Sequence, residues 1–190
     1  MKKELLLGVL AIGVVGLFMG AGTFAYFTSN QTVTGNTFTA GKLIVELRGP
    51  ASSPITINDM EPGVWYGTGD EYTLTIYNND GAGSTMDAKC RIRSHLDSQS
   101  VPGMWSKINV KVYKTYDSGV TWTEIYNGKL KDMVITGTEF DRLNPLPCGW
   151  SAMVKFEYQL DPAVGNDFMG ASVVFDMLVD ATQTSNPGWT

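Results

Sequence analysis

The sequence predicts an all-β protein, a β-sandwich of jelly-roll type with about eight strands. Two observations predict this class: apolar and polar residues alternate along most segments, and clusters of Gly, Asn, Asp and Pro separate those segments. A third observation is that no segment after residue 25 carries the 3.6-residue apolar period of an amphipathic helix.

The chain begins with the pattern of an export signal. Two lysines near the start precede an uncharged apolar run over 5–19. Thr23 and Ala25 then place small residues at positions −3 and −1 of an A-x-A-like cleavage site, and cleavage there leaves Tyr26 as the new N-terminus. The sequence therefore predicts a signal-peptide helix over 1–25 that a signal peptidase removes.

The alternative for this leader is an uncleaved membrane anchor. The run 5–25 is about as long as a bilayer-spanning helix requires, but Glu4 and several glycines weaken that interpretation. Cleavage is favoured, so we expect a secreted protein in the extracellular matrix or at the cell surface.

The mature chain is acidic and of single-domain length. Without residues 1–25 it has 12 basic and 18 acidic residues, a net charge of about −6 over 165 residues, which suits one domain with a real core. A nucleic-acid partner is not expected, because neutralising phosphates requires a basic face. We divide the chain into the leader 1–25, an N-terminal segment 26–39 and a sandwich domain 40–190.

The expected strands follow from period-two alternation and the turns between them. Each segment places its apolar side chains on one face, as a strand of a sandwich requires. In chain order the segments are 43–47, 72–77, 86–92, 108–112, 120–123, 152–160 and 171–181. Strong turn signals lie at 78–81 and 117–119, and short helical turns near 128–133 or 161–166 remain open.

Two cysteines suggest one disulfide in an exported protein. Cys90 faces inward by the parity of its strand, and Cys148 matches the inward parity of the strand that follows it. Such a bridge would contribute about 4 kcal/mol by restricting the unfolded chain. The alternative is two separate buried thiols.

Catalytic and metal-ligating patterns are scarce. The single histidine, His95, directly follows a predicted strand and is interpreted as a loop residue, and no H-E-x-x-H or G-x-S-x-G motif is present. The two cysteines lack metal-finger spacing. Asp161, Asn166 and Asp167 lack regular calcium-loop spacing and are interpreted as a turn. We therefore expect no enzyme activity, no catalytic residues, no metal and no cofactor.

Several segments resemble the TasA/camelysin family of exported proteins, which are processed by a SipW-type signal peptidase. They are the leader end 21–27, the run 36–43 with its F-T-A-G element, Met60-Glu61-Pro62-Gly63, the pattern 160–171 and Ala181-Thr182-Gln183. The resemblance implies a jelly-roll subunit of biofilm-matrix fibres, in which the mature N-terminal segment completes the sheet of the next subunit. The expected partners are identical subunits and the signal peptidase, and whether an accessory assembly protein starts the process is left open. Some family members are described as metalloproteases, an activity that the residues here do not support.

The composition of 26–39 supports the fibre interpretation separately. The segment is uncharged, free of proline and rich in β-prone residues, so it can donate hydrogen bonds along its length. The expected donor-strand residues are Tyr26, Phe27, Ser29, Gln31 and Val33. The alternative is an ordinary first strand or a frayed terminus in its own domain; the family resemblance favours the neighbour's sheet.

Three functions are therefore weighed. The favoured one is a structural subunit that polymerises head to tail through its N-terminal segment. The alternatives are a monomeric adhesion or ligand-binding sandwich at the cell surface, and a camelysin-like metalloprotease. Asn30 also begins an N-x-T sequon, which makes it a possible glycosylation site.

Overall fold

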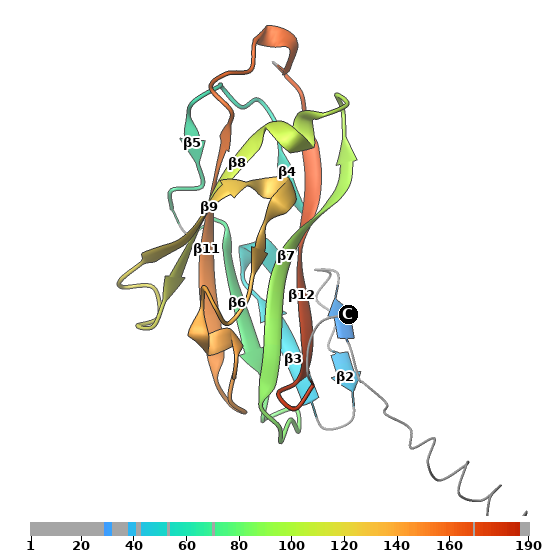
Figure 1. Cartoon of the computed structure of the whole chain (residues 1–190), viewed down its shortest axis with the longest axis vertical. Helices are drawn as coiled ribbons and strands as arrows, with labels where there is room; N and C mark the ends of the chain where they lie inside the picture. Colours follow the sequence, from blue (N-terminus) through green and yellow to red (C-terminus); the bar gives the residue numbers. More distant parts are fainter. Residues whose placement is uncertain are drawn as a thin grey trace, which may run out of the picture.

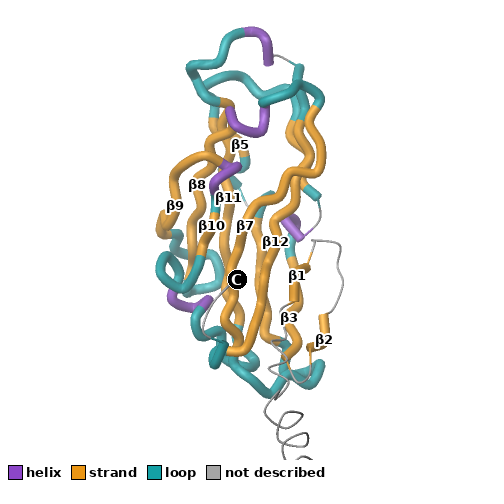
Figure 2. The backbone as a smooth tube through the Cα atoms, turned by 45° about the vertical axis from the view of Figure 1, so that its right-hand side comes forward, coloured by secondary structure: helices purple, strands orange, loops and turns teal. Residues whose placement is uncertain are grey.

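Two antiparallel sheets packed face to face form the protein (Figures 1 and 2). The structure is a computed structural model, and it describes residues 29–31, 38–40, 43–52, 54–69, 71–168 and 170–186. The predicted all-β sandwich is confirmed. The expected signal-peptide helix over 1–25, together with Tyr26, Phe27 and Val33, lies outside the described residues.

The first sheet is organised around a long pair of strands, β12 and β7. Its strands are β1 (Ser29–Gln31), β4 (Ile55–Ile57), β7 (Ala88–Gln99), β10 (Val134–Ile135) and β12 (Val173–Gln183). Their order is β1-β12-β7-β10, and β4 also pairs with β12. The β7–β12 ladder runs from Ala88 opposite Gln183 to Gln99 opposite Val173, so it spans almost both strands.

The second sheet has the order β2-β3-β6-β11-β8-β9, with β5 also paired to β11. Its strands are β2 (Phe38–Ala40), β3 (Leu43–Arg48), β5 (Trp65–Tyr66), β6 (Thr73–Asn78), β8 (Ile108–Thr115), β9 (Thr123–Lys129) and β11 (Ser151–Leu160). Five 3-10 turns complete the described elements: η1 (Pro50–Ser52), η2 (Met104–Lys107), η3 (Leu130–Asp132), η4 (Asp141–Leu143) and η5 (Asn166–Phe168). Of these, η3 lies in the first expected helical turn, and η5 starts at the end of the second.

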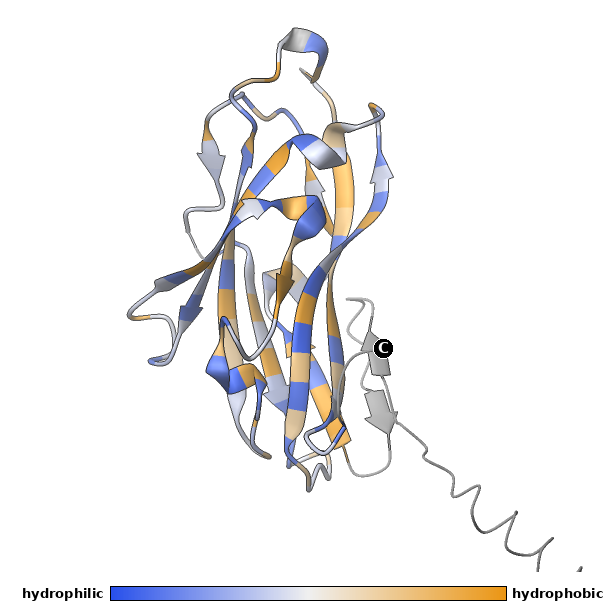
Figure 3. Ribbon diagram, viewed as in Figure 1, coloured by the Kyte–Doolittle hydropathy of each residue, from blue (hydrophilic) through white to orange (hydrophobic). Residues whose placement is uncertain are grey.

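The core lies between the sheets and follows the predicted alternation. Every second residue of β11 is buried, from Ala152 to Leu160, and Figure 3 shows the same alternation of hydrophilic and hydrophobic residues along β7. The ring of Phe175 on β12 lies 5.4 Å from that of Tyr158 on β11 and 5.5 Å from that of Trp105. These aromatic contacts join the two sheets across the core.

The length of β7 corrects the interpretation of His95. The expected strand ended near residue 92, but β7 continues to Gln99 because β12 offers it a partner along its whole length. His95 therefore lies within a strand, exposed to solvent and opposite Asp176, and not in a loop. The polar and charged residues after position 92 hid this continuation from the local pattern.

The hairpin after β8 also differs from its expected bounds. The strand predicted at 120–123 begins only at Thr123, and Val120 is 83% exposed in the turn. The Asp117 carboxylate accepts hydrogen bonds from the backbone N–H of Thr121 (2.8 Å) and the hydroxyl of Thr115 (2.7 Å). These bonds lower the pKa of Asp117 to about 2. The side chain therefore holds 117–121 as a turn, which delays the strand.

The predicted Cys90–Cys148 disulfide is not formed, because both thiols are free. Cys90 faces the core as predicted and is 1% exposed. Cys148 is only half-buried, and its Sγ lies 2.9 Å from the carbonyl oxygen of Ser84. The parity of the strand that follows does not carry back to Cys148, because the turn at Gly149 (φ +79°) intervenes.

Asn78 ties together two loops at one end of the sandwich. Its buried side chain donates to the carbonyl oxygens of Met86 (2.8 Å) and Leu146 (2.9 Å) and accepts from the hydroxyl of Ser84 (2.6 Å). Its backbone N–H donates to the carbonyl of Trp150. A fully buried amide with these partners fixes the loop after β6 against the loop before β11.

We expect Asn78→Ala to lower the free energy of unfolding by about 2–3 kcal/mol, because the Met86 carbonyl and the Ser84 hydroxyl lose their buried partner and the Leu146 carbonyl keeps only its bond from the Ala88 N–H. Urea denaturation of the mature protein measures this loss. The control is Asn127→Ala, whose exposed amide makes one long bond of 3.4 Å to Glu124 and should cost less than about 0.5 kcal/mol. Equal losses in the two variants would contradict the role of Asn78.

The free cysteines predict two very different thiol reactivities. Burial raises the pKa of Cys90 to about 12, so almost no thiolate exists at pH 8. We expect an aromatic disulfide reagent to modify one thiol, Cys148, in the folded protein and both thiols in urea. Cys148→Ser should abolish the fast reaction. If unfolded, unreduced protein had no titratable thiol, the two cysteines would be bridged and this prediction would be wrong.

Candidate functional site

The structure places the described part of the expected donor segment at the edge of the first sheet. In β1, Ser29 lies opposite Ala181, Asn30 opposite Asp180 and Gln31 opposite Val179. Within this single chain the strand therefore pairs with its own β12. Further along, β2 pairs with β3, with Phe38 opposite Val45.

The edge of β12 is only partly covered by these short strands. On this side, β4 pairs with 173–175 and β1 with 179–181, which together are six of the eleven residues of β12. Among the described residues, no strand pairs with 176–178 on this side. The candidate site is therefore this interrupted edge, which we call the β12 edge, with β1 seated on part of it.

A buried carboxylate with two arginines lies beside β1. Asp180 has no exposed surface, and its carboxylate accepts from Arg91 (2.6 and 2.9 Å) and from Arg93 (3.0 and 3.4 Å), both on β7. Two guanidinium groups offset the cost of burying this charge. The ion cluster therefore ties the strand that receives β1 to its neighbour in the sheet.

Asp176 lies in the interrupted part of the same edge. Asp176 is only 5% exposed, and no described residue offers a hydrogen bond to its Oδ1. Burial raises its pKa, the nearby carboxylate of Asp97 raises it further, and His95 opposes both effects. A buried acceptor without a partner destabilises the folded state.

The alternation pattern did not single out Asp176 or Asp180. They lie in the run 171–181, whose inward apolar residues dominated its interpretation. The available signal was the presence of two aspartates in a strand otherwise rich in apolar residues. Asn30, the possible glycosylation site, lies in β1 opposite Asp180, and its modification stays a prediction.

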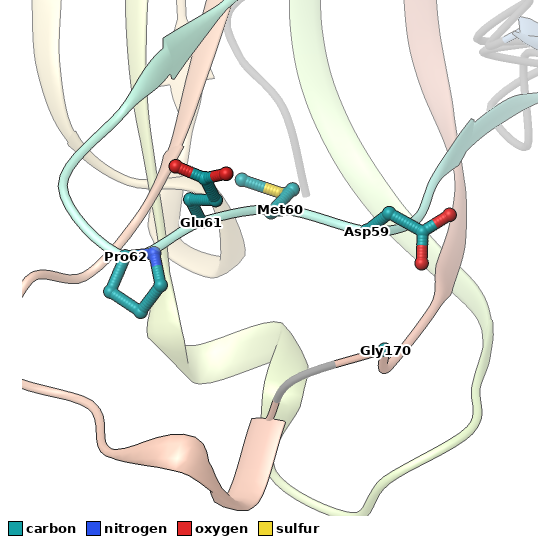
Figure 4. A pocket seen from close by; sticks show the side chains of 5 residues that line it. All are labelled: Asp59, Met60, Glu61, Pro62 and Gly170. Atoms are coloured by element: carbon teal, nitrogen blue, oxygen red, sulfur yellow. The ribbon is translucent and has the colours of Figure 1, made fainter.

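A shallow pocket of about 240 Å³ lies at the far end of β11 (Figure 4). Its lining residues are Asp59, Met60, Glu61, Pro62 and Gly170. Pro62 bridges to Leu160, the last residue of β11, and the backbone N–H of Gly63 donates to the Leu160 carbonyl. The Met-Glu-Pro-Gly motif thus forms one wall of this pocket, and the two acidic side chains of the lining are exposed.

Asp161, one of the residues weighed for metal binding, is engaged elsewhere. Asp161 forms an ion pair with Lys129 (2.6 Å) and accepts from the backbone N–H of Ala163 (2.9 Å), as in a turn. Across the described ranges, no group of three or more His, Cys, Asp or Glu side chains could hold a metal ion. In the same part of the chain, no helix is long and apolar enough to cross a bilayer.

Replacing the buried carboxylate of Asp176 should stabilise the protein at neutral pH. Because the pKa of Asp176 is higher in the folded than in the unfolded state, its charge reduces stability as pH rises through the folded pKa. We expect Asp176→Asn to raise the melting temperature by roughly 2–4 °C at pH 7, a gain that disappears once the pH falls below the unfolded pKa, near pH 4. Thermal scans at both pH values measure this, with Asp132→Asn as an exposed control. A pH-independent gain would contradict the account.

Comparison with known proteins finds one family model that matches part of the chain. The family model described as camelysin metallo-endopeptidase matches residues 1–94 of the 190. The matched part runs from the leader through β1 and β6 into β7. No curated protein matches the chain. The match confirms the resemblance to the TasA/camelysin family over the part of the chain from the leader into the long strand β7.

Proposed function

We propose that the mature chain is a secreted structural subunit that polymerises head to tail into extracellular filaments. In this proposal β1, within the segment 26–39, leaves its own β12 edge and pairs with the β12 edge of the next copy. The leader and the family support export, and the all-β architecture supports strand addition as the joint. The role is structural, although the family is named for a metallo-endopeptidase activity.

The observation that carries the proposal is the incomplete ladder on β12. The described β1 makes only three register pairs with β12, and 176–178 have no strand partner on that side among the described residues. A proline-free segment of fourteen residues has enough backbone donors and acceptors to pair along more of this edge. The β12 edge of another copy offers the same hydrogen-bonding groups. Moving the strand from its own edge to that of a neighbour therefore loses few contacts.

Exchange between copies produces an open assembly. The donating surface is the N-terminal segment and the accepting surface is the β12 edge, so the contact is heterologous and repeats from copy to copy. Cleavage after Ala25 would free the segment from its leader outside the cell and so time the assembly.

Removal of the segment tests the proposal. The mature protein, beginning at Tyr26, should form filaments visible by negative stain. A chain beginning at Phe38 keeps β2 and should remain monomeric in analytical ultracentrifugation, and a peptide of residues 26–39 should bind to it. Filaments of unchanged form from the shortened chain would defeat the proposal.

A double substitution to proline tests the ladder itself. Proline at Gln31 and Val33 removes two backbone donors and should stop filament growth. The matched control is threonine at both positions, which keeps the backbone N–H groups and the β propensity. Monomeric mature protein that degrades casein in a chelator-sensitive way would favour the metalloprotease alternative instead.

A further inference from the structure

Two exposed aromatic rings and a half-buried arginine lie together at the end of the sandwich where β11 begins. Tyr116 follows β8 and is 45% exposed, and Trp150 precedes β11 and is 54% exposed. Arg142, from η4, lies between them: its guanidinium carbon is 4.8 Å from the Tyr116 ring and 5.6 Å from the Trp150 ring. We call these three residues the arginine patch.

The guanidinium of Arg142 is held in place without a carboxylate partner. Its Nη1 donates to the Ser151 carbonyl at 3.4 Å and its Nη2 to the Tyr116 carbonyl at 3.3 Å, both long bonds. In the described part of the chain it forms no ion pair. The neighbouring carboxylate of Asp141 instead accepts from the Tyr116 hydroxyl and lies 3.9 Å from Lys114. The guanidinium group of Arg142 therefore retains N–H donors that can bind a carboxylate from another molecule.

The composition of the arginine patch is that of a protein-binding surface. Trp, Tyr and Arg are the residues that most often supply the energetic centre of protein interfaces, and large exposed aromatic side chains grouped together mark such sites. A sugar platform fits less well, because Arg142 and Lys114 both lie over the Tyr116 ring, at 4.8 and 5.1 Å, and leave it less free for stacking.

The opposite end of the molecule carries the complementary charge. The exposed acidic residues Asp59 and Glu61 flank the pocket in Figure 4, and their carboxylates form no ion pair within the described residues. Pro62 and Gly170 add apolar and backbone surface to the same pocket, whereas the Met60 side chain is buried in the core. The side chains of Asp59 and Glu61 point to different sides in Figure 4, so a guanidinium that approaches the pocket from either side would meet a carboxylate.

The two surfaces lie at opposite ends of one strand. Arg142 donates to Ser151, the first residue of β11, and the pocket adjoins Leu160, the last. Ten residues at about 3.3 Å each separate them by about 30 Å. Figure 1 shows β11 running along the length of the sandwich. The surfaces cannot meet within one copy, so a contact between them links successive copies.

We propose that the arginine patch of one copy binds the Asp59–Glu61 pocket of the next, with Arg142 bridging to those carboxylates. The occupant is a second copy of this acidic chain, because its far end presents, beside a pocket, two carboxylates that no described residue pairs with. The inference rests on the proposed head-to-tail assembly and adds to it a side-chain contact that is separate from strand donation.

A charge exchange between two variants tests this contact. Arg142→Glu alone places a further carboxylate against Asp59 and Glu61, and it should raise the critical concentration for filament growth at least about tenfold. The double variant Asp59→Lys with Glu61→Lys should be equally defective. An equimolar mixture of the two should grow, because alternating copies restore opposite charges at every joint. Lys131→Glu, which replaces an exposed cation on η3, makes the same charge change and serves as control.

The outcomes separate this inference from the proposed function. Defective single variants, a growing mixture and a normal control support the contact, as does weakening of wild-type growth by salt. Wild-type filaments with unimpaired Arg142→Glu growth overturn the contact and leave strand donation intact. A mixture that fails as badly as its components also overturns it. A wild-type mature chain that stays monomeric overturns both proposals. Circular dichroism of each variant confirms that it folds.

Discussion

The pairing of β12 with β7 is the constraint on which the rest of the structure depends. The ladder between them runs from Ala88 to Gln99, and β12 is buried on nearly its whole length, on both faces. The inward face supplies Phe175 to the aromatic contacts of the core, and the outward face carries Asp180 between its two arginines. One strand thus contributes to the core, to the ion cluster and to the edge that receives β1.

The edges of the two sheets differ in how open they are to pairing with another strand. At the edge strand β9, the pairing with β8 passes from Tyr126 to Glu124, so Ile125 forms a bulge, a feature that hinders pairing with another chain. The edge strand β10 has only two residues. The β12 edge, in contrast, is covered by two short strands with a gap between them. Of these edges it is the one best suited to accept a strand.

Local patterns were sufficient for the sandwich but not for its details. The inward positions of β11 followed from alternation alone, since each apolar side chain there gains the same buried environment. The extension of β7 to Gln99 did not, because it depends on a partner, Val173, that lies far along the chain. The free state of Cys148 depends on a turn at Gly149, and the setting of Arg142 depends on tertiary contacts. No spacing within the sequence encodes these.

The two proposed contacts, strand donation and the arginine patch, would have different roles in a filament. A backbone ladder binds an incoming strand largely through groups that every residue carries, so it supplies affinity but distinguishes poorly between partners. A charged side-chain contact on a different part of the surface adds specificity, because a wrong partner leaves charges unpaired. Once one joint has formed, the second becomes intramolecular and benefits from a high effective concentration. The arginine patch would therefore fix the angle between successive copies that strand donation alone leaves free.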